Sequence, residues 1–110
     1  MAKAKNKMDV VRSSGNVFTD LGLPQADEKQ TKVRLAVAIN QIIADSNLSQ
    51  AAAADLLEIN QPKISALANY RLDGFSVERL MHFLNALGRD VEIVIRKTSS
   101  RSAKIHVTAA

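Results

Sequence analysis

The chain of 110 residues contains no cysteine, which excludes disulfide bonds and thiolate metal sites. His82 and His106 are its only histidines, and no cluster of carboxylates has the spacing of metal ligands. No GxGxxG run and no phosphate-binding loop occurs either. We therefore expect no metal, no cofactor and no enzymatic activity, and we interpret His82 as a structural or surface residue of a helix.

Long apolar runs are also missing. No uninterrupted stretch approaches the roughly 20 residues of a membrane span, and the start MAKAKNK lacks the apolar region of a secretion signal. We therefore expect a soluble, cytoplasmic protein. Its few aromatic residues do not alternate along a strand, as a platform for stacking RNA bases requires. The 46% hydrophobic composition suits a single domain with a modest core.

Charge is unevenly distributed along the chain. The net charge is +4, but residues 1–12 carry +3 and residues 96–110 carry +4, so residues 13–95 carry −3. Basic tails are more often solvated than functional, yet near DNA they add phosphate attraction that weakens with salt. The overall basicity is therefore not by itself an argument for nucleic-acid binding.

What the chain does contain is a pair of short helical patterns near its middle. Residues 50–57 read QAAAADLL, a strongly helix-forming composition, and Ser49 can cap their first turn. Residues 58–59 interrupt the pattern, after which Asn60 can cap a second helix and Pro62 is tolerated in its first turn. The sequence therefore predicts two short helices joined by a tight turn.

The second of these helices has two distinct faces. Ile64, Leu67 and Ala68 recur at helical spacing and form the stripe that anchors it. Ala53 and Ala54 of the first helix stand where the two helices cross, and small side chains there let the backbones approach closely. The residues that point away from the stripe, toward a partner, are Pro62, Ser65, Ala66 and Asn69.

The joint spacing of these residues resembles the helix-turn-helix of the lambda-repressor-like, Cro/CI-type (XRE) regulators. Ala54 lies four residues after Gln50 and ten residues before Ile64, and Leu67 follows three residues later. Glu58 departs from the family pattern, which commonly has glycine there because the turn can require a positive φ. A generic helix pair in a helical bundle is the alternative interpretation.

The resemblance implies that the second helix lies in the major groove of DNA with its N-terminal end toward the bases. Gln61 can then bond an adenine edge, and Lys63 can reach a guanine or a phosphate. Ser65 can contact a guanine or a phosphate. Pro62 contributes only shape and apolar contact.

The resemblance also implies contacts to the sugar-phosphate backbone. Gln50 would bridge a phosphate and Gln61, and Asn69 with the following loop would hold the backbone. Alternatively, Gln50 and Asn69 are ordinary solvated residues and Arg71 pairs with Asp73 in its own loop. The predicted DNA-binding residues are Gln50, Gln61, Pro62, Lys63, Ser65, Asn69 and Arg71.

The segments around the motif complete a helical domain. Ser13–Pro24 mixes turn formers with apolar residues, and we interpret it as an arm packed on the domain. The apolar periodicity of residues 25–46 predicts a long first helix. A last helix begins at the cap residue Ser76 and ends at Gly88. The predicted apolar faces are Val33, Ala36, Val37, Ile39, Ile42 and Ile43 in the long helix and Leu80, Phe83, Leu84 and Leu87 in the last one.

Residues 90–97, DVEIVIRK, switch to a period of two, which predicts one β-strand in an otherwise helical chain. A lone strand leaves its backbone groups unpaired, so we expect it to pair with the same strand of a second copy. Its dimerisation residues would be Val91, Ile93 and Ile95. The alternative is an intrachain hairpin with residues 105–108, although the residues between have no tight-turn signature.

The sequence as a whole predicts an all-α, lambda-repressor-like helix-turn-helix bundle of about five helices, with one C-terminal β-strand that pairs across a dimer. A basic, disordered tail is expected at 1–14, a DNA-binding domain at 15–97 with the motif at 49–69, and a basic tail at 98–110. The order of elements from Gly15 to Lys97 also resembles the HigA-like antitoxins encoded beside RelE/HigB-like toxins.

These resemblances imply two functions. One is a transcriptional regulator, a repressor, that binds a pseudo-palindromic operator in double-stranded DNA as a homodimer. The other is an antitoxin that neutralises a RelE/HigB-type toxin and autoregulates its operon, with the tails or the arm facing the toxin. A toxin-like reading frame beside the gene would favour the second.

Overall fold

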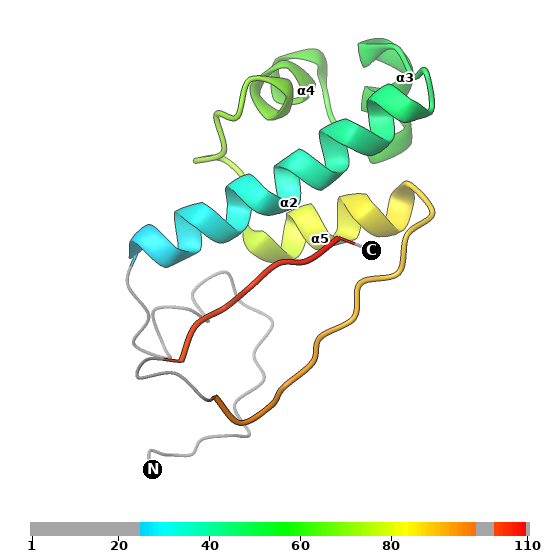
Figure 1. Ribbon diagram of the computed structural model, residues 1–110. Helices are drawn as coiled ribbons and strands as arrows, with labels where there is room; N and C mark the ends of the chain where they lie inside the picture. The colour runs from blue at the N-terminus through cyan, green and yellow to red at the C-terminus, as the bar shows by residue number, and fades with distance from the viewer. Residues whose placement is uncertain (1–24, 99–102, 110) are drawn as a thin grey trace.

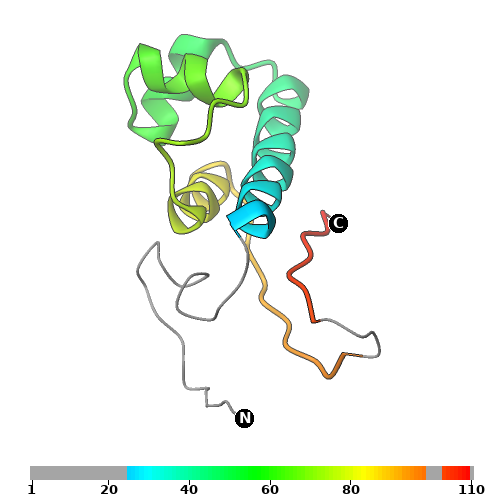
Figure 2. The same ribbon diagram turned by 90° about the vertical axis from the view of Figure 1, so that its left-hand side faces the viewer.

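The computed structural model describes residues 25–98 and 103–109, within which four α-helices form the scaffold. These are α2 (Gln25–Asp45), α3 (Gln50–Leu57), α4 (Gln61–Ala68) and α5 (Val77–Ala86). The long helix α2 packs mainly against α5, and α3 packs against α4 at one end of the bundle (Figures 1 and 2). The predicted all-α class is confirmed. The predicted arm and the N-terminal tail lie outside the described residues.

Each short helix begins at a side-chain cap that the sequence predicts. The Ser49 hydroxyl accepts a hydrogen bond from the amide of Ala52 at 3.0 Å. The Asn60 side-chain oxygen accepts from the amide of Lys63 at 3.0 Å, and Ser76 caps α5 in the same way. Because each cap satisfies an amide that the helix itself cannot pair, these residues fix where α3, α4 and α5 begin.

Every described helix ends in the same way, with one residue in the left-handed conformation. After α3, for example, the amide of Ile59 donates to the carbonyl of Ala54 at 3.0 Å, which closes the last turn. Glycine stands at this position only after α5. The left-handed residues are Asn47 with φ 56°, Glu58 with φ 59°, Tyr70 with φ 60° and Gly88 with φ 82°.

The hydrophobic core draws on all four described helices and on the loop between α4 and α5. The buried stripe predicted for the last helix is confirmed in full, and so is the burial of Ala53 and Ala54 at the helix crossing. No helix in this part of the chain is long and apolar enough to cross a membrane. The core residues are Leu35, Ala36, Ile39, Ala53, Ala54, Leu57, Ile64, Leu67, Leu72, Phe75, Val77, Leu80, Phe83, Leu84 and Leu87.

The predicted apolar face of the long helix is partly wrong. Ala36 and Ile39 are buried, but Val33 and Val37 are 42% and 49% exposed, and Leu35 is buried instead. At about 100° per residue, Val33 and Val37 lie roughly 120° and 160° around the helix from Ile39. They therefore face away from α5, where the core lies.

The predicted β-strand at 90–97 is absent from the single chain, and the described residues contain no strand at all. The segment leaves α5 and runs away from the helices, and it forms no ladder with residues 103–109 (Figures 1 and 2). The alternative, an intrachain hairpin with residues 105–108, is therefore absent as well. A strand needs a neighbouring strand to pair its backbone groups, and the described part of one copy supplies none.

Candidate nucleic-acid interface

The orientation of α4 is fixed by contacts along its inner side. Ile64 and Leu67 are 2% and 0% exposed, and they pack in the same core as the two alanines of α3. The Asn40 side-chain amide of α2 also donates to the Leu67 carbonyl at 3.1 Å. This bond ties the C-terminal turn of α4 to the long helix.

The outer face of α4 consists of Gln61, Pro62, Ser65 and Asn69. Gln61, Ser65 and Asn69 follow each other at intervals of four residues, so they form one ridge along the helix. Gln61, Pro62 and Asn69 are exposed and Ser65 is half-buried. Asn69 donates its side-chain amide to the Ser65 carbonyl at 2.9 Å, whereas the Gln61 amide bonds to no other described residue. The Gln61 side chain is thus free to bond a ligand with both its donor and its acceptor.

Lys63 differs from these neighbours because its side chain is bound within the domain. It is half-buried, and its Nζ donates to the carbonyl of Gly74 at 3.3 Å. The same Nζ lies 5.1 Å from the centre of the Phe75 ring, a cation–π distance. The ammonium therefore points to the loop before α5 rather than outward with Gln61.

Two other predicted contact residues flank α4. Gln50 is exposed at the start of α3, and Arg71 is exposed in the loop after α4. Within the described part of the chain no hydrogen bond joins Gln50 to Gln61, and no ion pair joins Arg71 to Asp73. The guanidinium of Arg71 therefore carries an unneutralised charge beside the outer face of α4.

The predicted dimerisation residues differ in their exposure to solvent. Val91 is half-buried and packs against the core. Ile93 and Ile95 are 73% and 89% exposed, and Val94 between them is 64% exposed. Three consecutive large apolar side chains thus stand in solvent on an unpaired segment.

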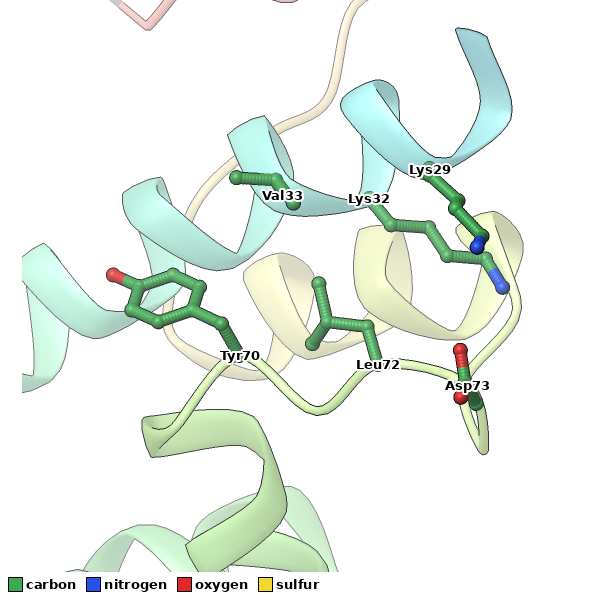
Figure 3. A pocket seen from close by; sticks show the side chains of 6 residues that line it. All are labelled: Lys29, Lys32, Val33, Tyr70, Leu72 and Asp73. Carbon is green, nitrogen blue, oxygen red and sulfur yellow. The ribbon is translucent and has the colours of Figure 1, made fainter. Parts of the chain in front are cut away.

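A small hollow of about 120 Å³ lies between α2 and the loop that follows α4. Figure 3 shows the lysine ammonium groups at one end near Asp73, and the tyrosine ring beside Val33 at the other end. The Lys32 Nζ also lies 3.8 Å from the Glu28 carboxylate one turn away on α2, so part of the positive charge at this end is already paired. The residues that line the hollow are Lys29, Lys32, Val33, Tyr70, Leu72 and Asp73.

The described residues contain no group of three or more histidine, aspartate or glutamate side chains that could hold a metal ion. His82 lies on the exposed side of α5, with Nε2 3.7 Å from the Glu78 carboxylate one turn away. It is a surface residue of a helix.

Comparison with known proteins identifies the family. A family model described as a helix-turn-helix domain matches residues 17–96. A solved structure named "Putative XRE Family Transcriptional Regulator" is 64% identical to this chain, with a TM-score of 0.77. The chain belongs to the XRE family. The alignment covers 79% of this XRE-family chain and 100% of the chain in that structure. No curated protein matches this chain.

Membership of the XRE family indicates which function the geometry of α3 and α4 serves. The helix-turn-helix of α3 and α4 is a DNA-binding domain, and the prediction that this chain is not an enzyme is confirmed because the family is non-enzymatic. Sequence reasoning missed the partners of Lys63. A backbone carbonyl carries no signature in the sequence, and Gly74 lies 11 residues further along the chain.

Proposed function

We propose that this XRE-family protein is a sequence-specific transcriptional regulator, a repressor, that reads the major groove of double-stranded DNA as a homodimer. The observation that carries the proposal is the outer face of α4. Its buried side is held by the core, its first turn is capped by Asn60, and its exposed ridge presents Gln61 and Ser65. A rigid helix with a free amide at its N-terminal end is what base reading in the major groove requires.

Gln61 is the proposed base-reading residue. Its unbonded side-chain amide can donate to and accept from one adenine edge at the same time, and such a bidentate pair contributes about 1–3 kcal/mol of discrimination. Ser65, one turn further along, adds a hydroxyl contact, and Pro62 supplies apolar contact. Lys63 lies among these residues, but its ammonium is engaged within the domain.

Contacts to the phosphates are assigned to Gln50, Asn69 and Arg71. Gln50 and Arg71 flank the ridge on both sides, at the start of α3 and after the end of α4, and Asn69 is the last member of the ridge. Arg71 is the one with a full charge, and no described acidic side chain neutralises it. Phosphate contacts set the position of the protein on the duplex, whereas base contacts set its sequence preference.

The domain at 15–97 is proposed to act with its tails, 1–14 and 98–110, in the cytoplasm. Because residues 13–95 carry −3, attraction to DNA depends on the local placement of cations and on the tails, which carry the positive charge. A single domain of this kind binds weakly, so we propose that two copies bind together.

Residues 90–97 are the proposed dimer contact, through antiparallel pairing of two copies. Pairing about a two-fold axis at Val94 places Ile93 opposite Ile95 of the partner subunit. It also places Glu92 opposite Arg96 of the partner subunit, so opposite charges face each other twice. The exposure of Ile93 and Ile95 in the single chain supports this contact.

Charge exchange tests this register. Glu92→Lys should weaken the dimer, because it places lysine opposite arginine, and adding Arg96→Glu should restore it. An axis at Ile93 would instead place Asp90 opposite Arg96 of the partner subunit, so Asp90→Lys with Arg96→Glu is the matched control. Gel filtration of the wild type comes first, and a monomer at micromolar concentration would rule the dimer out.

We propose neutralisation of a toxin as a second function of this chain. Of the segments expected to face a toxin, the N-terminal tail 1–12 and the arm 13–24 lie outside the described residues, whereas the C-terminal tail 98–110 is described at 98 and 103–109. Co-expression of this chain with a RelE/HigB-like toxin encoded beside its gene tests it directly. Relief of toxicity would support an antitoxin, and the absence of such a gene would favour a plain regulator.

Base reading is tested by Gln61→Ala. We expect the preferred operator to lose about 1–3 kcal/mol of its advantage over random DNA, while binding to random DNA stays the same. Gln30→Ala is the matched control, since Gln30 is also an exposed glutamine whose side chain bonds to no other described residue, but it lies on α2. Fluorescence anisotropy with both duplexes measures this. An unchanged ratio for Gln61→Ala would show that the base contact is assigned to the wrong residue.

A further inference from the structure

The Lys63 ammonium joins the first turn of α4 to the loop before α5. Its Nζ donates to the Gly74 carbonyl at 3.3 Å and lies 5.1 Å from the Phe75 ring centre. We propose that Lys63 is a positioning residue, which holds α4 at the angle needed to read DNA and does not itself contact DNA. This inference rests on the proposed DNA-reading function and assigns a different role to one residue of its site.

The anchor to which Lys63 is tied is rigid. Phe75 is 3% exposed, and its ring meets the Phe83 ring edge to face, with centres 5.7 Å apart and planes 77° apart. The ring therefore cannot follow a movement of the lysine. At the other end of α4, Asn40 bonds the Leu67 carbonyl at 3.1 Å. The helix is thus held at both ends, and Lys63 supplies the tie at the end that presents Gln61.

Gly74 is the second member of this contact. A Cβ at this position would lie 2.9 Å from the Lys63 Nζ, which is closer than real Cβ contacts come. Its backbone is not left-handed, so the conformation of the loop does not demand glycine. An alanine here is therefore accommodated by moving the end of the lysine side chain. Gly74→Ala thus breaks the contact from the loop, without changing any residue of α4.

The two roles of Lys63 differ in their response to salt. A lysine on a phosphate releases a counterion on binding, so its removal lowers the slope of log Kd against log salt concentration by about 1. A lysine that binds a carbonyl and an aromatic ring releases none. Removing it changes the affinity for the operator and leaves the slope unchanged.

The experiment compares Lys63→Met, Gly74→Ala and the double variant on the selected operator over a range of salt concentrations. Methionine keeps the apolar stem but removes the charge. We expect each single variant to bind roughly three- to tenfold more weakly with an unchanged salt slope. We also expect the double variant to be no weaker than either single one, because both changes break the same contact.

Arg79→Met is the matched control, because Arg79 lies 5.4 Å from the centre of the Phe83 ring and belongs to α5. It should keep operator affinity within about twofold, since it ties nothing to α4. Circular dichroism of each variant verifies the helical content. A loss of slope by about 1 in Lys63→Met, with normal binding by Gly74→Ala, would show that Lys63 contacts DNA directly and would overturn the inference.

A spectroscopic readout tests the contact without relying on affinity. The Phe75 ring should shift the Lys63 ε protons upfield in the NMR spectrum, and this shift should remain when operator DNA is added. Loss of the shift on adding DNA would mean that the ammonium leaves the ring, and the inference would fail while the proposed function stands. A wild-type protein that binds no DNA sequence preferentially would refute both.

Discussion

The turn between α3 and α4 offers the sharpest test of the local energetics. Glu58 has φ 59° and ψ 44°, in the left-handed region that costs a residue with a side chain about 1–2 kcal/mol. Its side chain is exposed and bonds to no other described residue, so Glu58→Gly removes strain without removing a contact. Glycine loses about 0.5–1 kcal/mol more backbone entropy on folding. The net gain should be about 0.5–1 kcal/mol of unfolding free energy.

Two further variants separate strain from other effects. Glu58→Gln removes the charge but keeps the side chain, so it should leave the unfolding free energy within about 0.3 kcal/mol of wild type. Gly88→Ala is the reverse experiment, because Gly88 has φ 82° and an added Cβ would meet nothing within 4 Å beyond its chain neighbours. Backbone strain of about 1–2 kcal/mol, less the roughly 0.5–1 kcal/mol of backbone entropy that alanine saves on folding, should lower its unfolding free energy by about 0.5–1 kcal/mol.

Urea denaturation followed by circular dichroism measures all three variants, and Glu58→Gly should also raise the Tm by roughly 2–8 °C. Operator affinity should be unchanged or slightly higher, since a negative charge is removed near DNA. A Glu58→Gly protein no more stable than Glu58→Gln would refute the assignment of strain to this turn.

Three further predictions concern the support of α4 and the basic residue Lys97 at the end of the domain. Leu67→Ala should lose about 2–5 kcal/mol of unfolding free energy in urea titrations, because Leu67 is 0% exposed. Asn60→Ala should lose about 1 kcal/mol through the missing cap, and Asn60→Asp should lose little, in the same assay. Lys97→Ala should weaken binding to operator and random DNA alike, as measured by anisotropy. A change in the ratio of these two affinities would instead place Lys97 among the base contacts.

Local rules predicted the helix-turn-helix closely. Ser49 and Asn60 act on amides only three residues away, so their effect can be read from neighbours in sequence. The helical spacing of the apolar residues in α5 also predicted correctly which side of the helix is buried, because only one face of this helix is apolar. The departure from glycine at position 58 suggested a differently shaped turn, but Glu58 itself adopts the left-handed conformation with φ 59°.

The misassigned face of α2 has a different cause. Apolar residues occur around much of this helix, so periodicity alone left its rotation undetermined. Val33 and Val37 were expected in the core, but α5 and α4 cover the side that carries Leu35 and Ile39. The position of those partner helices is a property of the whole fold.

In the candidate site, too, some features could be predicted from the sequence and others could not. Sequence and resemblance placed Gln61 and Ser65 on the outer face of α4, where the structure has them. The ammonium of Lys63 could not be located, because it binds a carbonyl that any residue would carry. The period-two pattern at 90–97 did not become a strand, because pairing of the backbone depends on a neighbouring strand and no described residue of the chain provides one.

The central claim is that this XRE-family protein reads a specific DNA sequence as a dimer. The most direct measurement is selection from random double-stranded DNA by the purified full-length protein, followed by sequencing. We expect enrichment of a pseudo-palindrome whose two half-sites lie one helical turn apart, roughly 34 Å between centres. Gln61→Ala should lose preference at one base pair in each half-site. Enrichment of no sequence, or of a single site without symmetry, would contradict it.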